Sequence, residues 1–186
     1  MPKAKSTSVK TKKTLLVSSS KPVGRETAII QTTGPVPAKD RGHSVALLQP
    51  LLRDLIDLQL QVKLAHWNVR GAQFFFLHQL FDQVYGVVAE AVDSVAERIA
   101  QLGAVVEASV QQVAAHTSLP AMRLSPAAPV CLQGVVQGLS HTCQSIHAAL
   151  PKFGHDPSSV DLLTKLLGDA EKQLWMLEAH LQPAHS

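Results

Sequence analysis

A long amphipathic segment in the middle of the chain carries four metal-ligating side chains in a symmetric arrangement. Residues 73–102 hold apolar side chains at helical spacing up to Gly103, which predicts one long helix. On that helix, four polar side chains share an arc of about 100°, offset from the apolar stripe. They are His78, Asp82, Asp93 and Glu97. Their numbers pair symmetrically, 78 with 97 and 82 with 93, about a point between Val87 and Val88.

These four side chains cannot form one metal site within a single helix. Asp82 and Asp93 lie about 16 Å apart along a helix, whereas a metal ion holds N and O ligands at about 2 Å. Either other helices of the same chain complete each half, or a second copy of the helix does. Two copies packed antiparallel about a two-fold axis would place His78 beside Glu97 of the partner, and Asp82 beside Asp93. The symmetric spacing favours this second arrangement, and Gly86 near its centre allows the two backbones to approach closely.

The ligand types indicate the class of metal. Imidazole together with carboxylates suits iron, manganese or zinc, and no thiolate belongs to the set. His66, further upstream, is a candidate fifth ligand, although a lone histidine is more often a core residue. Spacing alone is equally compatible with a solvated helix face, on which His78 and Asp82 form an ordinary i, i+4 pair.

The remaining periodicity predicts an all-α, ferritin-like four-helix bundle. The joints after the first and third long helices are short, so those neighbours should be antiparallel. Residues 104–126 can span the bundle end to end at about 3.3 Å per extended residue, and they carry a possible short helix over 109–116. The long helices are expected at about 44–70, with Ser44 as N-cap or Pro50 as a start or kink, and at 73–102, 127–150 and 157–181.

Charge divides the chain into two parts. Residues 1–41 hold nine of the 17 Lys and Arg but two of the 14 acids, so they carry +7 and the remainder carries −4. They are rich in Ser, Thr and Pro, which predicts a disordered basic tail before a bundle domain at 42–186. No apolar run reaches the roughly 18 residues that a membrane span needs, so no membrane partner is expected. Cys131 and Cys143 are too far apart on one helix to form a disulfide, which suits a reducing cytosol.

Three segments resemble the Dps family, the miniferritins that protect DNA in starved cells. The sequence HWNVRG at residues 66–71 matches the family's HWN-x-x-G signature. Residues 76–82 resemble its second segment and residues 93–98 its third. The intervals between the five candidate ligands fit the same pattern. The resemblance covers about residues 44–182 and is strongest over 64–103.

The resemblance implies a hollow dodecamer with ferroxidase sites at two-fold interfaces. His66, His78 and Asp82 would come from one subunit, and Asp93 and Glu97 from its partner. Miniferritins oxidise Fe(II), typically with hydrogen peroxide, and store the Fe(III) mineral inside the shell. The chain would thus be an oxidoreductase acting on metal ions, and other divalent metals could occupy the same site.

Further residues take expected roles from the same resemblance. Trp67 resembles the tryptophan beside the family's site, with a radical-quenching or a plain packing role. Family members admit iron through acidic pores near the start of the last long helix, where Asp156 and Asp161 are the matching candidates. Asp156 precedes Pro157, however, which also fits a helix N-cap.

The basic tail resembles the Lys-rich extension with which some miniferritins bind DNA. Cationic side chains that neutralise phosphates release counterions, so such binding is sequence-independent and salt-sensitive, and many tails on one shell would act together. Alternatives are a solvated tail that keeps the shell soluble, or a cleaved transit peptide. The residues expected to contact DNA are Lys3, Lys5, Lys10, Lys12, Lys13, Lys21 and Arg25.

Two functions from different classes therefore compete. The first is an iron-oxidising, iron-storing miniferritin in the cytoplasm, associated with the nucleoid. The second is a non-specific DNA-coating protein whose iron chemistry is secondary. A di-iron oxygenase would need a Glu-x-x-His pair, which the sequence lacks.

Overall fold

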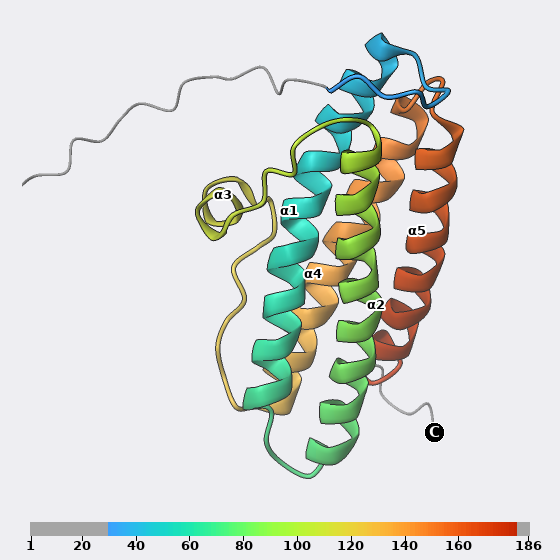
Figure 1. Ribbon diagram of the computed structural model, residues 1–186. Helices are drawn as coiled ribbons and strands as arrows, with labels where there is room; N and C mark the ends of the chain where they lie inside the picture. The colour runs from blue at the N-terminus through green and yellow to red at the C-terminus, as the bar shows by residue number, and fades with distance from the viewer. Residues whose placement is uncertain (1–29, 182–186) are drawn as a thin grey trace, which may run out of the picture.

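Four long helices pack side by side in the computed structural model, which describes residues 30–181 (Figure 1). A short helix, α3, projects from the long connection between α2 and α4, and a 3-10 turn, η1, follows α4 (Figure 1). The elements are α1 (Ala38–Asn68), α2 (Phe74–Gln101), α3 (Val110–His116), α4 (Ala128–Ala149), η1 (Leu150–Lys152) and α5 (Pro157–Glu178). The predicted ferritin-like bundle is confirmed. None of the helices in this part of the chain is long and apolar enough to cross a membrane.

The long connection sets the direction of α4. α1 packs against α2 and α4, and α5 packs against the same two helices. At the end of the bundle where α2 begins, the Arg70 N–H donates to Pro126 O at 2.9 Å. The connection therefore returns the chain to that end, and α4 runs parallel to α2, as the loop lengths predict (Figure 1).

The start of α1 differs from the prediction. The helix begins at Ala38, rather than at Ser44 or Pro50, so it takes in the last four residues of the predicted tail. Ser44 is fully buried, whereas Pro50 is exposed inside the helix. Pro50 deprives the exposed Ala46 carbonyl of its helical donor, but water can satisfy that group. Residues 1–29 of the predicted tail lie outside the described residues.

The other helices follow the sequence pattern closely. Gly103 has φ +88°, a conformation that L side chains avoid, so α2 ends where periodicity stops. Ser109 and Gln112 form a reciprocal capping box at the start of α3. Cys131 and Cys143 are both buried and form no disulfide. The largest fully buried side chains fill the space between all four long helices and include Leu52, Leu58, Phe81, Ile99, Leu139, Ile146 and Leu163.

Candidate metal centre

The structure brings His66 and His78 together. His66 lies in the last turn of α1 and His78 near the start of α2, and the short loop at Gly71, with φ +110°, makes the two helices antiparallel neighbours. The imidazole rings stack with their centroids 3.7 Å apart. His66 and His78, two of the five predicted ligands, are thus neighbours within one chain.

Reciprocal hydrogen bonds orient the two rings. His66 Nδ1 lies 2.8 Å from the His78 carbonyl oxygen, and His78 Nδ1 lies 2.9 Å from that of His66. A carbonyl oxygen only accepts, so each Nδ1 must carry the proton and donate. In the neutral ring, Nε2 then keeps a lone pair. A backbone hydrogen bond on one ring nitrogen is how proteins present the other to a metal ion, so both histidines suit metal binding.

Asp82 lies one turn after His78, and its carboxylate has a cationic partner. The Lys63 ammonium donates to Asp82 Oδ1 at 2.5 Å and lies 4.2 Å from the centre of the Tyr85 ring. His66 Nδ1 is 3.9 Å from the same carboxylate oxygen. The hydrogen bond from Lys63 lowers the pKa of Asp82. A basic side chain thus occupies the place beside Asp82 where a metal cation could bind.

Asp93 and Glu97 lie apart from this cluster, on the other half of the same helix. Both carboxylates are exposed. Within residues 30–181, no three side chains of His, Cys, Asp or Glu come close enough to hold a metal ion. Within this part of the chain, other helices therefore do not complete either half.

Two polar hollows lie along α2, one in each half of the helix. One polar hollow of about 300 Å³ is lined by Asp82 with its neighbours Gln79 and Gln83. Another, of about 250 Å³, lies between α2 and α5 and is lined by residues that include Glu97, Arg98 and Ser158. The hollows lie on opposite sides of the midpoint between Val87 and Val88, where the symmetric numbering places the two half-sites.

Comparison with known proteins identifies the family. The ferritin-like domain family matches residues 45–184. The DNA protection during starvation protein of Agrobacterium fabrum is 31% identical over 155 residues, which cover 82% of this chain and 96% of that protein. The chain belongs to the Dps family of ferritin-like proteins.

Solved Dps structures share the bundle. DpsC from Streptomyces coelicolor superposes with a TM-score of 0.81 at 28% identity, covering 89% of this chain and 98% of that one. DpsA14 from the same organism gives 0.80 at 30% identity, covering 85% and 95%. The Dps resemblance of the three sequence segments is therefore confirmed.

Lys63 and Tyr85 are site residues of this Dps chain that sequence reasoning missed. Lys63 is three residues before His66 and so lies on the same face of α1, but a single lysine at that spacing is an ordinary surface feature. Its pairing with Asp82, 19 residues away, depends on the docking of α1 against α2. Trp67 is 57% exposed, so plain core packing does not account for it within one chain.

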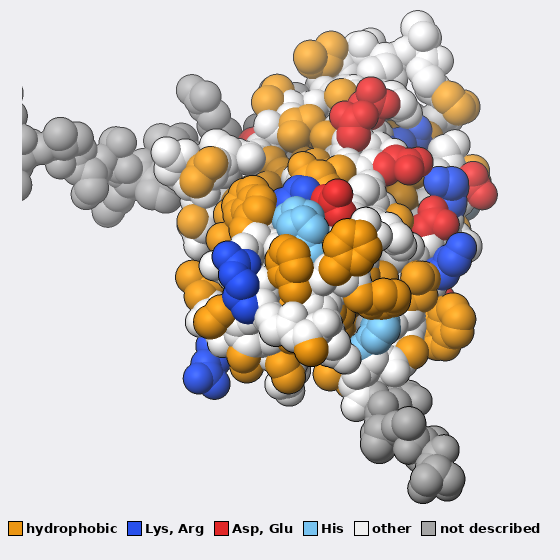
Figure 2. Space-filling model, turned by 90° about the horizontal axis from the view of Figure 1, so that it is seen from below, with side chains coloured by type: hydrophobic (Ala, Val, Ile, Leu, Met, Phe, Trp, Pro, Cys, Tyr) orange, Lys and Arg blue, Asp and Glu red, His pale blue; other side chains and the backbone are white. Residues whose placement is uncertain are grey.

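The exposed aromatic residues gather at the end of the bundle that holds the histidines. Figure 2 shows hydrophobic side chains crowded around histidine on this end face. The exposed aromatic residues here are Trp67, Phe74, Phe75, Phe76 and Trp175. The Phe74 ring lies 5.1 Å from that of His78, so this aromatic rim reaches the candidate ligands.

The structure contradicts the pore assignment of Asp156. Its carboxylate is fully buried at the start of α5, where it accepts from the Ser159 N–H at 3.1 Å and from Arg98 Nη2 at 2.5 Å. Asp156 is therefore the N-cap of α5, the alternative that the sequence also allowed. Asp161 is exposed and remains a candidate residue for the iron-entry pore. The tail residues from Lys3 to Arg25 lie outside the described residues.

We expect Lys63→Met to tighten divalent-metal binding. The substitution removes a positive charge that competes for the Asp82 carboxylate. An exposed ion pair of this kind is worth up to about 1 kcal/mol, which corresponds to an affinity gain of about two- to fivefold. Titration with Co(II), followed by calorimetry, measures the change. Lys172→Met, an exposed lysine on α5, is the matched control and should leave the affinity unchanged. Equal affinities for Lys63→Met and the unmodified chain would show that the ammonium does not compete.

Proposed function

We propose that this protein is a miniferritin that oxidises Fe(II) at sites shared between two subunits and stores the Fe(III) product within a shell. The observation that carries the proposal is the His66–His78 pair, whose Nδ1 atoms both donate to backbone carbonyls. In the neutral rings, each Nε2 thereby keeps its lone pair, and the Asp82 carboxylate lies 3.9 Å from His66 Nδ1. The complementary acids, Asp93 and Glu97, would reach them from a partner subunit.

The proposed ligand set suits iron as a substrate in both oxidation states. Imidazole nitrogen binds Fe(II), whereas the carboxylates of Asp82, Asp93 and Glu97 are hard, anionic ligands that favour the more highly charged Fe(III). Few histidines and several carboxylates also leave positions for water or an oxidant. With hydrogen peroxide as the oxidant, two Fe(II) each give one electron, and the peroxide takes up two protons to yield two water molecules. Removing iron and peroxide together would protect DNA from hydroxyl radicals.

The purified chain should assemble into a particle of about twelve times the 20.0 kDa of one subunit, the dodecamer that the Dps resemblance implies. A two-fold site by itself requires at least a dimer. Light scattering with size-exclusion chromatography measures the mass. The same particle should oxidise Fe(II) faster with peroxide than with oxygen and retain the iron on gel filtration. A monomer under these conditions would rule out the proposed shell.

A second function, DNA binding by the tail in the cytoplasm, is favoured by its +7 charge and by the relative named for DNA protection during starvation. Deleting residues 1–29 leaves α1 complete, because this helix begins at Ala38. We expect the deletion to abolish gel-shift binding to duplex DNA while Fe(II) oxidation stays unchanged. Binding by the full-length chain should weaken steeply with salt.

A matched control separates charge from length in the tail. A full-length variant would carry Gln at the seven cationic positions from Lys3 to Arg25 that sequence reasoning assigns to DNA. This variant should behave like the deletion. If either variant binds DNA as tightly as the unmodified chain, the tail is not the DNA-binding element. The proposed nucleoid association would then have no mechanism.

A further inference from the structure

The Lys63 ammonium limits how many iron ions the proposed site takes at once. It donates to Asp82 Oδ1 at 2.5 Å, so a cation that binds this oxygen must first displace it. Repulsion between like charges then disfavours a second Fe(II) beside the first. When iron is scarce, the site therefore holds one Fe(II). A single Fe(II) gives one electron, whereas hydrogen peroxide needs two to become water.

Peroxide that receives one electron becomes a hazard. The electron from Fe(II) breaks the O–O bond, and the products are Fe(III), hydroxide and a hydroxyl radical. This radical becomes water when a nearby side chain gives up a hydrogen atom to it. Phenol, indole and thiol groups give up hydrogen most readily, because the radicals that they form are stabilised.

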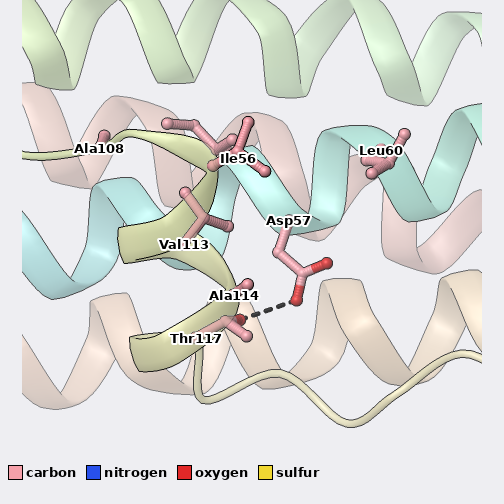
Figure 3. Close-up of a pocket in the computed structure, with 8 residues that line it drawn as sticks. Ile56, Asp57, Leu60, Ala108, Val113, Ala114 and Thr117 are labelled. Carbon is pink, nitrogen blue, oxygen red and sulfur yellow. Dashed lines mark hydrogen bonds between the residues drawn. The ribbon is translucent and has the colours of Figure 1, made fainter. Parts of the chain in front are cut away.

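Several parts of the chain offer no such hydrogen near the site. The groove between α1 and α3 is lined by aliphatic side chains together with Asp57 and Thr117, whose hydrogen bond Figure 3 marks. The two thiols, Cys131 and Cys143, are buried on α4, whereas the candidate ligands lie on α1 and α2. The aromatic residues of α1 and α2 therefore come into consideration.

The Tyr85 ring lies beside the Asp82 half of the site. Lys63 Nζ is 4.2 Å from the ring centre and 2.5 Å from Asp82 Oδ1, so the ring centre lies within about 7 Å of that oxygen. Tyr85 and Asp82 are three residues apart on one face of α2. The ring is half-buried and packs against the core, which partly shields it from solvent.

The contact with Lys63 determines what can leave the ring. Loss of an electron alone would place a positive charge on the ring beside the ammonium, and it would remove the attraction between the cation and the ring face. Loss of the electron together with the phenolic proton leaves the ring neutral. Tyr85 is therefore suited to donate a hydrogen atom and form a neutral tyrosyl radical.

Two other aromatic residues fit this role less well. Phe74 lies 5.1 Å from the His78 ring but carries no O–H or N–H hydrogen. Trp67 follows His66 in the sequence, so it is turned by about 100° around α1 from that ligand. Its side chain is also 57% exposed, so a radical formed there would face solvent.

We propose that Tyr85 supplies the second electron when a site holds only one Fe(II). Its phenol gives a hydrogen atom to the hydroxyl radical, which yields water and a tyrosyl radical. A later Fe(II), together with one proton, reduces this radical to tyrosine and becomes Fe(III). With protonation of the hydroxide, the steps together consume two Fe(II), one peroxide and two protons and yield two Fe(III) and two water molecules. This inference rests on the proposed function, because it concerns the same site.

Electron paramagnetic resonance of rapidly frozen, full-length particles tests the role of Tyr85. Particles given one Fe(II) per site and then hydrogen peroxide should show a tyrosyl radical. The chain contains one tyrosine, so a signal that narrows with ring-deuterated tyrosine belongs to Tyr85. Tyr85→Phe should abolish the signal, and Trp67→Phe, the matched control, should keep it. A tryptophanyl signal in the unmodified chain, or no protein radical at all, would overturn the proposal.

Two further measurements separate the hydrogen atom from the ring and from the ammonium. Tyr85→Phe keeps the ring against Lys63 but lacks the phenolic hydrogen, so its particles should release more hydroxyl radical to a spin trap. Equal release by Tyr85→Phe and the unmodified chain would contradict the proposal. With two Fe(II) per site, Lys63→Met should weaken the tyrosyl signal, because a second Fe(II) then binds beside Asp82 and supplies the electron. An undiminished signal in Lys63→Met would contradict the link to iron loading.

These outcomes are distinguishable from failure of the proposed function. Particles that oxidise Fe(II) with peroxide but form no tyrosyl radical would refute only the role of Tyr85. Particles that leave Fe(II) unoxidised in the presence of peroxide would refute the proposed iron site itself, and the role of Tyr85 with it.

Discussion

His78→Ala and Asp93→Ala should each slow Fe(II) oxidation by about 100-fold or more. Each would remove a direct ligand of the proposed site, and even indirect partners of metal ligands affect activity by about 10- to 100-fold. The two residues lie on different turns of α2 and belong to separate clusters in the single chain. Equal losses from both substitutions are expected because one shared site needs a histidine from one subunit and an acid from the other. Stopped-flow absorbance of the Fe(III) product measures the rate.

Two substitutions control for loss of charge and for loss of imidazole. Glu90 is an exposed acid on α2 outside the ligand set, and His116 is an exposed histidine at the end of α3. Glu90→Ala and His116→Ala should keep the rate of the unmodified protein. If Asp93→Ala also keeps that rate, the site consists only of the cluster around His66, His78 and Asp82.

Asp156→Ala should destabilise the fold by about 3–5 kcal/mol, the effect of removing one partner of a buried ion pair. Arg98 would lose its carboxylate partner while keeping only the Ser159 and Gln101 oxygens as acceptors. α5 would also lose its N-cap. Urea denaturation of full-length particles measures the loss, and the thermal midpoint should fall by about 10 °C for a domain of this size.

Asp161→Ala is the matched control, because this acid lies in the same part of α5 but is exposed. Its stability should stay within about 0.5 kcal/mol of that of the unmodified chain. If Asp161→Ala instead slows iron uptake without loss of stability, Asp161 lines the pore. Equal stability of the two variants would contradict the structural role of Asp156.

The contribution of Asp156 should depend on pH in a defined direction. Burial alone would raise the pKa of this carboxyl, but hydrogen bonds from Ser159 and the charge of Arg98 outweigh it, and the pKa is lowered. A lowered pKa in the folded state stabilises the fold above the unfolded value, near 3.9, and this stabilisation is lost as pH falls through the folded value. The difference in stability between the unmodified chain and Asp156→Ala should therefore be constant from neutral pH to about pH 5 and shrink below about pH 4.

The sequence predicts those features that depend on neighbours along one helix. The bounds of α2 follow from apolar periodicity and from Gly103. The spacing of the four candidate ligands predicts that they share one face of that helix. The start of α1 was missed because Ser44 and Pro50 both resemble helix starts, whereas Ser44 is buried in the core and Pro50 faces solvent within the helix.

Features that depend on docking between helices were beyond the sequence pattern. Lys63 reaches Asp82 only because α1 and α2 pack together, and Arg98 reaches Asp156 only because α5 starts beside the end of α2. The sequence indicates that Asp156 can cap a helix, because Pro157 follows it. It does not indicate that the carboxylate is buried. The symmetric spacing of the candidate ligands is the exception, since it predicts a contact between two chains.

Co-assembly of His78→Ala and Asp93→Ala chains tests the shared site most directly. In mixed dimers one site would combine both defects and the other would be intact, so random mixing should restore about one quarter of the wild-type sites. Fe(II) oxidation by refolded mixtures should accordingly recover to about a quarter of the wild-type rate, while each variant alone stays inactive. A mixture as inactive as its components would contradict a metal site built across the two-fold interface.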